Sequence, residues 1–174
     1  TSQVQFHSMA TNQMTVDDGD IYSYANFRMT TGFNLHLQGD SNILLDTSIA
    51  ANQSSGILLD IGSTTVTVNK VYYWTSGSAW ALTDADAEST STGLIAYANS
   101  SGTASSQRMV LNGIVFSSGH SFTIGAPLYL STTNGALTNT VPSGNNDIAR
   151  VVGYAITTDE IYFNPDNTWV KVSA

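Results

Sequence analysis

Hydrophobic and polar residues alternate with a period of two along much of the chain. Phe and Leu alternate with Asn, His and Gln in residues 33–38, and Val alternates with Thr in residues 65–68. Near the C-terminus, "RVVGYAITTDEIYFNPDNTWV" has the pattern of three strands separated by a polar turn and a tight bend. A period of two places alternate side chains on opposite faces of an extended strand. We therefore predict an all-β protein, with a short turn over residues 84–88 as the one helical candidate.

Turn residues divide this pattern into strands and suggest two regions. Asn134 and Gly135 lie between two alternating runs, which is the strongest short-range hairpin signal in the chain. The irregular, polar connection over residues 84–92 marks the expected domain boundary. We expect a β-rich N-terminal region over residues 1–83 and a small β-barrel or sandwich module over residues 93–174.

A short repeat leaves two arrangements open for the N-terminal region. The string "ILLD" occurs at residues 43–46 and again at residues 57–60. The two copies are either strands of one sheet or successive rungs of a fibre-like stack. Two copies are too few to establish a stacked repeat, so the simple sheet is favoured.

The C-terminal strands are predicted at residues 150–156 and 160–164, with Ile161 and Phe163 sharing a face of the second strand. Alternation places Val152, Tyr154 and Ile156 on one face of the first strand, and Val151, Gly153 and Ala155 on the other. Both faces of that strand are largely apolar. We therefore expect it to be covered on both sides, by the barrel core and by a neighbour or the N-terminal region.

The composition supports the β assignment and restricts the possible partners. The chain of 174 residues is 41% hydrophobic but only 10% charged, and its net charge is −8. A typical domain has about a quarter of its residues charged, and Ser, Thr and Asn, which supply the polarity here, favour turns and strands over helices. The few cations are dispersed along the sequence, as Arg28, Lys70, Arg108, Arg150 and Lys171. The net negative charge and this dispersion argue against the clustered basic surface that nucleic-acid binding requires, so we expect no nucleic-acid partner.

Other features limit the chemistry and the location. The chain has no cysteine, so disulfides and cysteine metal sites are excluded. It contains no 18-residue apolar run and no signal-peptide pattern, so we expect no membrane insertion. It begins at Thr1, which fits either removal of an initiator Met before a small residue or a piece of a longer protein.

One motif suggests a nucleophile but lacks its base. The string "GDSN" at residues 39–42 resembles the Gly-Asp-Ser block around the nucleophile of some lipases and esterases. A serine nucleophile needs a histidine base, and that family places Asp and His three residues apart near the C-terminus. The last histidine here is His120, and Ser117 stands three residues before it. We therefore interpret Ser41 as part of a polar turn and expect no catalytic residue and no enzymatic activity.

Acidic and histidine residues give no convincing metal site. Alternating acids could bind a hard cation, but calcium usually needs six to eight oxygen ligands, so a solvated connection and a turn are favoured. These acids are Asp84, Asp86 and Glu88 in the connection, and Asp17, Asp18 and Asp20 in the turn. The three histidines are His7, His36 and His120, and their spacing fits no metal motif. We expect no metal and no cofactor.

An aromatic cluster offers a third interpretation. Its members are Tyr72, Tyr73, Trp74 and Trp80. Such rings could stack against a sugar, but they also fill β-cores and interfaces, and packing is favoured because no polar clamp accompanies them. Asn52 and Asn99 begin Asn-x-Ser sequons, which carry little meaning without a secretory signal.

The C-terminal half resembles a module of tailed-bacteriophage structural proteins. The residues that carry the resemblance are "GAPLYLS" at 125–131, a hairpin, Thr140 with "PSG" at 142–144, "RVVGYA" at 150–155 and "IYFNPD" at 161–166. Similar strings occur at the ends of tail-fibre-like proteins. The order of elements is also similar to the small β-barrel of capsid cement proteins, although Ala126 stands where that pattern often has Asp. The resemblance covers about residues 72–174, and its motifs are structural rather than catalytic.

The resemblance implies a place in a virion. We expect a non-enzymatic structural protein on the virion surface, assembled in the host cytoplasm, which decorates or cements the capsid. The alternatives are a tail-fibre segment involved in host attachment, or a carbohydrate-binding module. The expected partners are further copies of the chain, in a homotrimer, and the major capsid protein or tail proteins.

Overall fold

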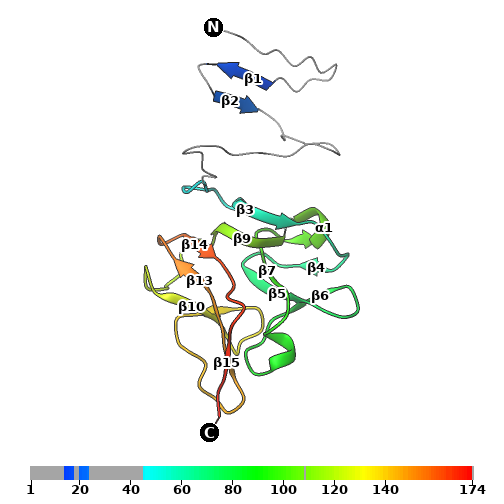
Figure 1. The fold of residues 1–174 in the computed structure, drawn as a ribbon, viewed down its shortest axis with the longest axis vertical. Helices are drawn as coiled ribbons and strands as arrows, with labels where there is room; N and C mark the ends of the chain where they lie inside the picture. The colour runs from blue at the N-terminus through cyan, green and yellow to red at the C-terminus, as the bar shows by residue number, and fades with distance from the viewer. Residues whose placement is uncertain (1–13, 18–19, 24–44, 108, 174) are drawn as a thin grey trace. The chain divides into compact units, whose positions relative to one another are not determined.

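The computed structural model describes residues 14–17, 20–23, 45–107 and 109–173, in two units, Thr1–Ile43 and Leu44–Ala174 (Figure 1). In the first unit, β1 (Met14–Asp17) pairs with β2 (Asp20–Ser23) in an antiparallel hairpin. Several predictions fall outside the described residues: the strand at 33–38, the start of the first "ILLD" copy, and Asp18, His7, His36 and Ser41.

The second unit consists almost entirely of antiparallel strands, which confirms the all-β prediction. Its main sheet has nine strands, which are β3 (Ser54–Leu59), β5 (Lys70–Trp74), β6 (Trp80–Leu82), β7 (Ile95–Ala98), β9 (Met109–Phe116), β10 (Pro127–Leu130), β11 (Leu137–Thr138), β13 (Val151–Ala155) and β14 (Glu160–Phe163). The smaller pairs are β4 (Thr65–Val66) with β8 (Gly102–Thr103), and β12 (Ile148–Ala149) with β15 (Val170–Lys171). The short helices are a 3₁₀ turn (Glu88–Thr90) and α1 (Ala104–Gln107).

Strand β9 is the centre of the main sheet. It pairs with β3 over nearly its whole length, with β14 over its C-terminal half and with β7 near its N-terminus. A strand has only two edges, so β3 occupies one of them and β14 and β7 share the other. Two arms therefore diverge from β9: an N-terminal arm of β7, β5 and β6, and a C-terminal arm of β14, β13, β10 and β11 (Figure 1).

The main core draws on both arms. Its fully buried members are Val71, Ala85, Tyr97, Val110, Val115, Leu128, Leu130, Val152, Ala155, Ile161 and Phe163, with Ile95 only 3% exposed. The rings of Tyr97, on β7, and Phe163, on β14, lie 5.8 Å apart and pack across from one arm to the other. Apolar area removed from water by this curled sheet is the main source of its stability.

A second core lies on the opposite face of the N-terminal arm. Its buried members are Val66, Tyr72, Trp80, Ala96, Ala98, Ala104 and Met109. Alternate residues of β5 and β7 thus face different cores, and all four residues of β7 are buried. The two-residue period explains how Tyr72 and Val71, adjacent in sequence, reach separate cores.

The hairpin between β10 and β11 joins the ends of the arms. The backbone N–H of Val71 donates to the Gly135 carbonyl at 2.9 Å, and the Gly135 N–H donates to the Thr83 carbonyl at 2.7 Å. Gly135 has a φ of 68°, which suits glycine, and a Cβ there would approach Leu82 Cδ2. The hairpin predicted from Asn134 and Gly135 is confirmed.

The sheet runs across the expected domain boundary at residues 84–92. Strands β5 and β6 precede those residues but belong to the same sheet as β13 and β14, and Val71 of β5 lies in the same core as those strands. The curled sheet is therefore not confined to residues 93–174, and the division between compact units falls between residues 43 and 44 instead. Local composition suggested a boundary at residues 84–92, but strands on both sides of those residues belong to one sheet because they are connected through β9.

The C-terminal strands lie where they were predicted, but some of their side chains point to a different face of the sheet than expected. Strands β13 and β14 pair antiparallel, and Ile161 and Phe163 are both fully buried. In the pairing with β10, however, Leu128 lies opposite Gly153 and the next residue, Tyr129, lies opposite Val151, so Val152 has no partner and forms a β-bulge. Such a bulge interrupts the alternation. Val152 is therefore buried, whereas Tyr154, predicted on the same face, is 43% exposed.

Candidate functional site

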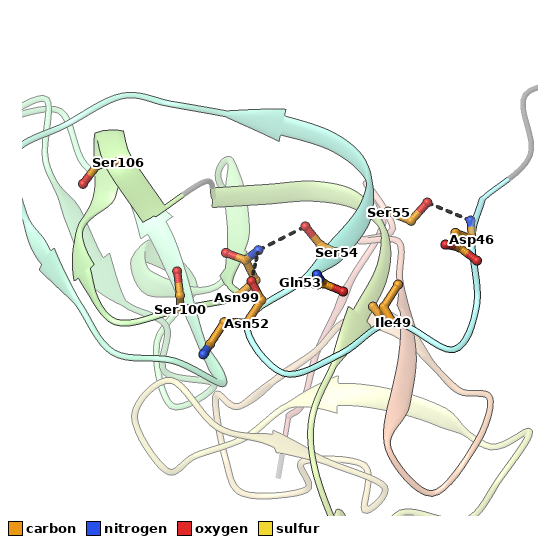
Figure 2. Close-up of a pocket in the computed structure, with 9 residues that line it drawn as sticks. All are labelled: Asp46, Ile49, Asn52, Gln53, Ser54, Ser55, Asn99, Ser100 and Ser106. Carbon is orange, nitrogen blue, oxygen red and sulfur yellow. Dashed lines mark hydrogen bonds between the residues drawn. The ribbon is translucent and has the colours of Figure 1, made fainter. Parts of the chain in front are cut away.

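A polar pocket of about 510 Å³ lies between the turn before β3 and the loop after β7 (Figure 2). Its lining consists of one carboxylate, three carboxamides, four hydroxyls and one apolar side chain. These residues are Asp46, Ile49, Asn52, Gln53, Ser54, Ser55, Asn99, Ser100 and Ser106. They come from segments far apart in the sequence.

The turn that forms one wall is specified by its own side chains. The Gln53 N–H donates to the Ala50 carbonyl, and the Ala50 N–H donates to Gln53 Oε1, each at 3.0 Å. Asn52 has a φ of 62°, a left-handed conformation that asparagine tolerates better than most residues. This turn leads into β3.

Asn99 forms the buried part of the pocket. It is only 5% exposed, and its Nδ2 donates to Ser54 Oγ at 3.1 Å and to the Asn52 carbonyl at 3.4 Å. Its Oδ1 is buried and accepts no hydrogen bond within the described residues. In Figure 2 the carboxamide points its nitrogen towards Ser54 and its oxygen away from it. The amide therefore ties the two segments together, and its oxygen can accept one further hydrogen bond.

A buried carboxylate fixes the other wall. Glu160 is 5% exposed and accepts backbone N–H groups from Ser48 and Ile49, the latter at 3.0 Å. Thr157 Oγ1 donates to its second oxygen at 3.3 Å. A buried charge is costly unless it is hydrogen-bonded, and these donors satisfy this one. The contacts hold the segment before β3 against β14.

The pocket is suited to hydrogen bonding rather than to catalysis. Asp46 is the only ionisable side chain in its lining, so no acid and base face each other there. A serine nucleophile would need a base within hydrogen-bond reach, and this lining provides none. Besides the Asp46 carboxylate, the pocket offers neutral amide and hydroxyl groups that can donate to or accept from a small polar group.

Tyr72 and Trp80 of the aromatic cluster belong to the second core, and Tyr73 and Trp74 are partly buried against the cores, as the packing interpretation predicted. Tyr72 and Trp80 are 5% and 3% exposed, and the rings of Trp74 and Trp80 meet edge-on at 4.9 Å. The indole N–H of Trp80 donates to the Ile61 carbonyl at 2.9 Å. The buried rings of Tyr72 and Trp80 are not accessible for stacking against a sugar.

The acidic connection forms a local turn. The backbone N–H of Asp86 donates to Asp84 Oδ1 at 3.0 Å, and Glu88 pairs with Lys171 at 3.7 Å. Partial desolvation, followed by repulsion from Asp84 and Asp147, raises the pKa of Asp86 above 3.8. Among the described residues, no three His, Cys, Asp or Glu side chains are grouped so as to hold a metal ion.

The remaining candidates are dispersed. His120 stacks on Phe122 with the rings 5.0 Å apart, and neither of its nitrogens has a hydrogen-bond partner within the described residues. Asp17 and Asp20 are register partners at the turn end of the β1–β2 pair.

Sequence reasoning missed the burial of Arg150, which is 3% exposed. Its Nε donates to the Asp166 carbonyl at 2.7 Å, and one terminal nitrogen donates to the carbonyls of Ser91 and Gly93 at 2.7 and 3.0 Å. Burial lowers the pKa of the guanidinium, and the charge of Asp166 partly opposes this effect. Arg150 begins the "RVVGYA" string, whose apolar character was the only available signal that it enters a core.

No protein-family model matches the chain, and no curated protein is significantly similar to it. The described residues include no helix long and apolar enough to cross a membrane.

Proposed function

We propose that the chain is a non-enzymatic structural protein on the surface of a tailed-phage virion, and that it decorates and stabilises the capsid. A tail-fibre segment involved in host attachment is the alternative, because the same C-terminal strings are similar to both kinds of protein. The proposal includes virion-surface localisation after assembly in the host cytoplasm.

The observation that carries this proposal is the packing of the resembling strings against one another. The string at 125–131 contains β10, the string at 150–155 contains β13, and the string at 161–166 contains most of β14. β10 pairs with β13, and β13 pairs with β14, in one antiparallel meander. The strings thus describe one folded unit, as expected of motifs retained for architecture.

Individual motif residues have structural roles. Gly153 lies where a Cβ would overlap the Tyr162 carbonyl oxygen, so only glycine fits the close approach to β14. Arg150 ties the start of one string to the Asp166 carbonyl in another. Pro127 begins β10, a position that tolerates the missing N–H. These roles support architecture over catalysis.

Surface composition supports self-association. The chain is poor in charge, and large apolar side chains remain at the surface, namely Ile57, Leu82, Leu94, Ile124, Val141, Tyr154, Trp169 and Val170. Apolar surface without interspersed charge favours contacts between proteins. We propose a homotrimer that docks on the major capsid protein or on tail proteins.

The test is the position of the chain in an intact particle. Antibody labelling and image reconstruction of purified particles should place it at regular positions on the capsid lattice, and mass measurement in solution should give a trimer. Labelling confined to the tail would favour the tail-fibre alternative. A chain that stays monomeric and never associates with particles would contradict the proposal.

The absence of enzymatic activity has a separate test. Assays on generic esters and on host surface polysaccharides should detect no turnover. Hydrolysis that disappears in the Ser41→Ala variant would overturn this part of the proposal.

A further inference from the structure

A second groove, of about 380 Å³, lies along the outer side of β13 and the segment after β14. Its lining combines one aromatic ring with proline, valine, two carboxamides and a carboxylate. These residues are Tyr154, Pro165, Val151, Asn164, Asn167 and Asp166. This combination differs from the polar pocket beside Asn99, which contains no ring.

The ring is at the surface because of the bulge in β13. Beyond the extra residue Val152, Gly153 and Ala155 lie opposite the buried Phe163 and Ile161, so Tyr154 faces outwards. The ring is 43% exposed, and the ring of Tyr162, its cross-strand neighbour, is half-buried. An exposed ring backed by a strand offers a flat apolar surface at little entropic cost.

The polar wall of the groove is held rigidly against β13. The Asn164 N–H donates to the Val152 carbonyl and the Asp166 N–H donates to the Val151 carbonyl, both at 2.9 Å. The buried Arg150 donates to the Asp166 carbonyl at 2.7 Å. Groups fixed before binding lose little freedom when a ligand arrives.

The side chains of this wall are also oriented. Asn112 Nδ2 donates to Asn164 Oδ1 at 2.6 Å, which leaves the Asn164 Nδ2 to donate to a ligand. Asp166 Oδ1 accepts the Thr168 N–H at 2.9 Å, and the carboxylate remains exposed. The hydrogen bonds from Thr168 lower the pKa of Asp166 below 3.8, so it is an ionised acceptor at neutral pH.

We propose that this groove binds a neutral sugar unit of a glycan, with one apolar face of the pyranose on the Tyr154 ring and its hydroxyls on Asp166 and Asn164. Sugars present an apolar C–H face and a rim of hydroxyls, and the groove offers an aromatic ring for the first and an anionic acceptor and an amide donor for the second. Acidic sugars are disfavoured, since Asp166 and the net charge of −8 repel anions. This inference does not depend on where the protein is located.

The experiment is an NMR titration of the full chain with single sugars and disaccharides at millimolar concentration. The neutral probes are glucose, galactose, mannose, N-acetylglucosamine, maltose and lactose; glucuronic acid is the acidic probe. At least one neutral probe should shift the amide signals of Tyr154, Asn164, Asp166 and Asn167, with a dissociation constant on the order of 1 mM. Glucuronic acid should bind more weakly.

Variants distinguish stacking on the Tyr154 ring from non-specific binding. Tyr154→Ala should weaken binding about tenfold, equivalent to about 1.4 kcal/mol, whereas Tyr154→Phe should retain most of it. Asp166→Asn keeps an oxygen that can accept the Thr168 N–H but removes the charge. It should weaken the binding of neutral sugars and reduce the difference in affinity between neutral and acidic sugars. Leu82→Ala, at an exposed position of β6 outside both the groove and the polar pocket, is the control and should leave binding unchanged. Melting temperatures establish that each variant is folded.

Three outcomes would overturn the inference. The first is that no neutral probe shifts the groove signals at tens of millimolar. The second is binding that persists unchanged in Tyr154→Ala. The third is shifts confined to the polar pocket around Asn99.

Discussion

The two arms that diverge from β9 have similar apolar strands, but the protein covers them differently. In the N-terminal arm, β7 is buried on both faces, between the main core and the second core around Trp80. In the C-terminal arm, β13 and β14 bury one face around Phe163, while Tyr154 on the other face remains 43% exposed. An alternating apolar pattern therefore does not by itself tell which faces the chain covers.

The difference follows from what lies next to each arm. Segments close to the N-terminal arm in sequence supply its second cover, through Val66 of β4 and Ala104 of α1. Beyond the outer face of β13, the neighbouring residues 164–167 form a polar wall that leaves a groove. Partner or ligand contacts are expected on the open face of β13 rather than on β7, which is covered on both faces.

The largest effect should come from the buried ring of the C-terminal arm. Phe163 is fully buried and packs against Tyr97, so Phe163→Ala should lower the free energy of unfolding by about 3–5 kcal/mol. Tyr154→Ala, on the exposed face of the adjacent strand, should cost about 0.5 kcal/mol or less. Urea denaturation of both variants measures the contrast. Equal losses would mean that the two faces are covered alike.

Removal of the buried cation should have the next largest effect. Arg150→Leu leaves the carbonyls of Asp166, Ser91 and Gly93 without their donor in a buried site, and we expect a loss of about 3 kcal/mol. Arg150→Lys should recover only part of it, because an ammonium cannot reproduce the spread of guanidinium donors. Denaturant midpoints compare the two variants. A Leu variant as stable as the parent would show that these bonds contribute nothing net.

A side chain at Gly153, beside the bulge, should destabilise the protein by steric overlap. In Gly153→Ala the new Cβ would overlap the Tyr162 carbonyl, and we expect a loss of about 1–3 kcal/mol. Gly93→Ala is the matched control, because nothing lies within 4 Å of a Cβ there, and it should melt like the parent. Calorimetry of both proteins tests the close approach between β13 and β14.

The smallest effect concerns the fully covered arm at alkaline pH. Burial raises the pKa of Tyr97 from 10.0 to about 12. A raised folded-state pKa means that this contribution to stability is complete below pH 10 and is lost as the pH rises towards 12. Tyr97→Phe loses a hydroxyl that donates to Asn69 Oδ1, at a cost of about 1 kcal/mol at neutral pH. The free energy of unfolding of Tyr97→Phe should therefore fall less between pH 10 and 12 than that of the parent. Urea denaturation of both proteins across that range measures the two slopes. Equal slopes would contradict the raised pKa of Tyr97.

The sequence predicted the strands more reliably than their surroundings. The positions of β13 and β14, the hairpin at Gly135 and the burial of Trp80 follow from alternation, turn chemistry and aromatic packing, which are local. The bulge at Val152 was missed because it arises from pairing with β10, and it reversed the expected facing of Tyr154. The burial of Asn99 was missed for the same kind of reason, since its partners lie on a turn distant in sequence. The continuity of the sheet past residues 84–92 likewise depends on β9.

The most direct test of the contrast between the arms is hydroxyl-radical footprinting of the tyrosines in the intact chain, read by mass spectrometry. We predict rapid modification of Tyr154 and strong protection of Tyr72 and Tyr97, which are 5% and 1% exposed. Tyr72 and Tyr97 modified as fast as Tyr154, or Tyr154 protected to the same degree as they are, would contradict the account of one arm covered on both faces and one arm left open.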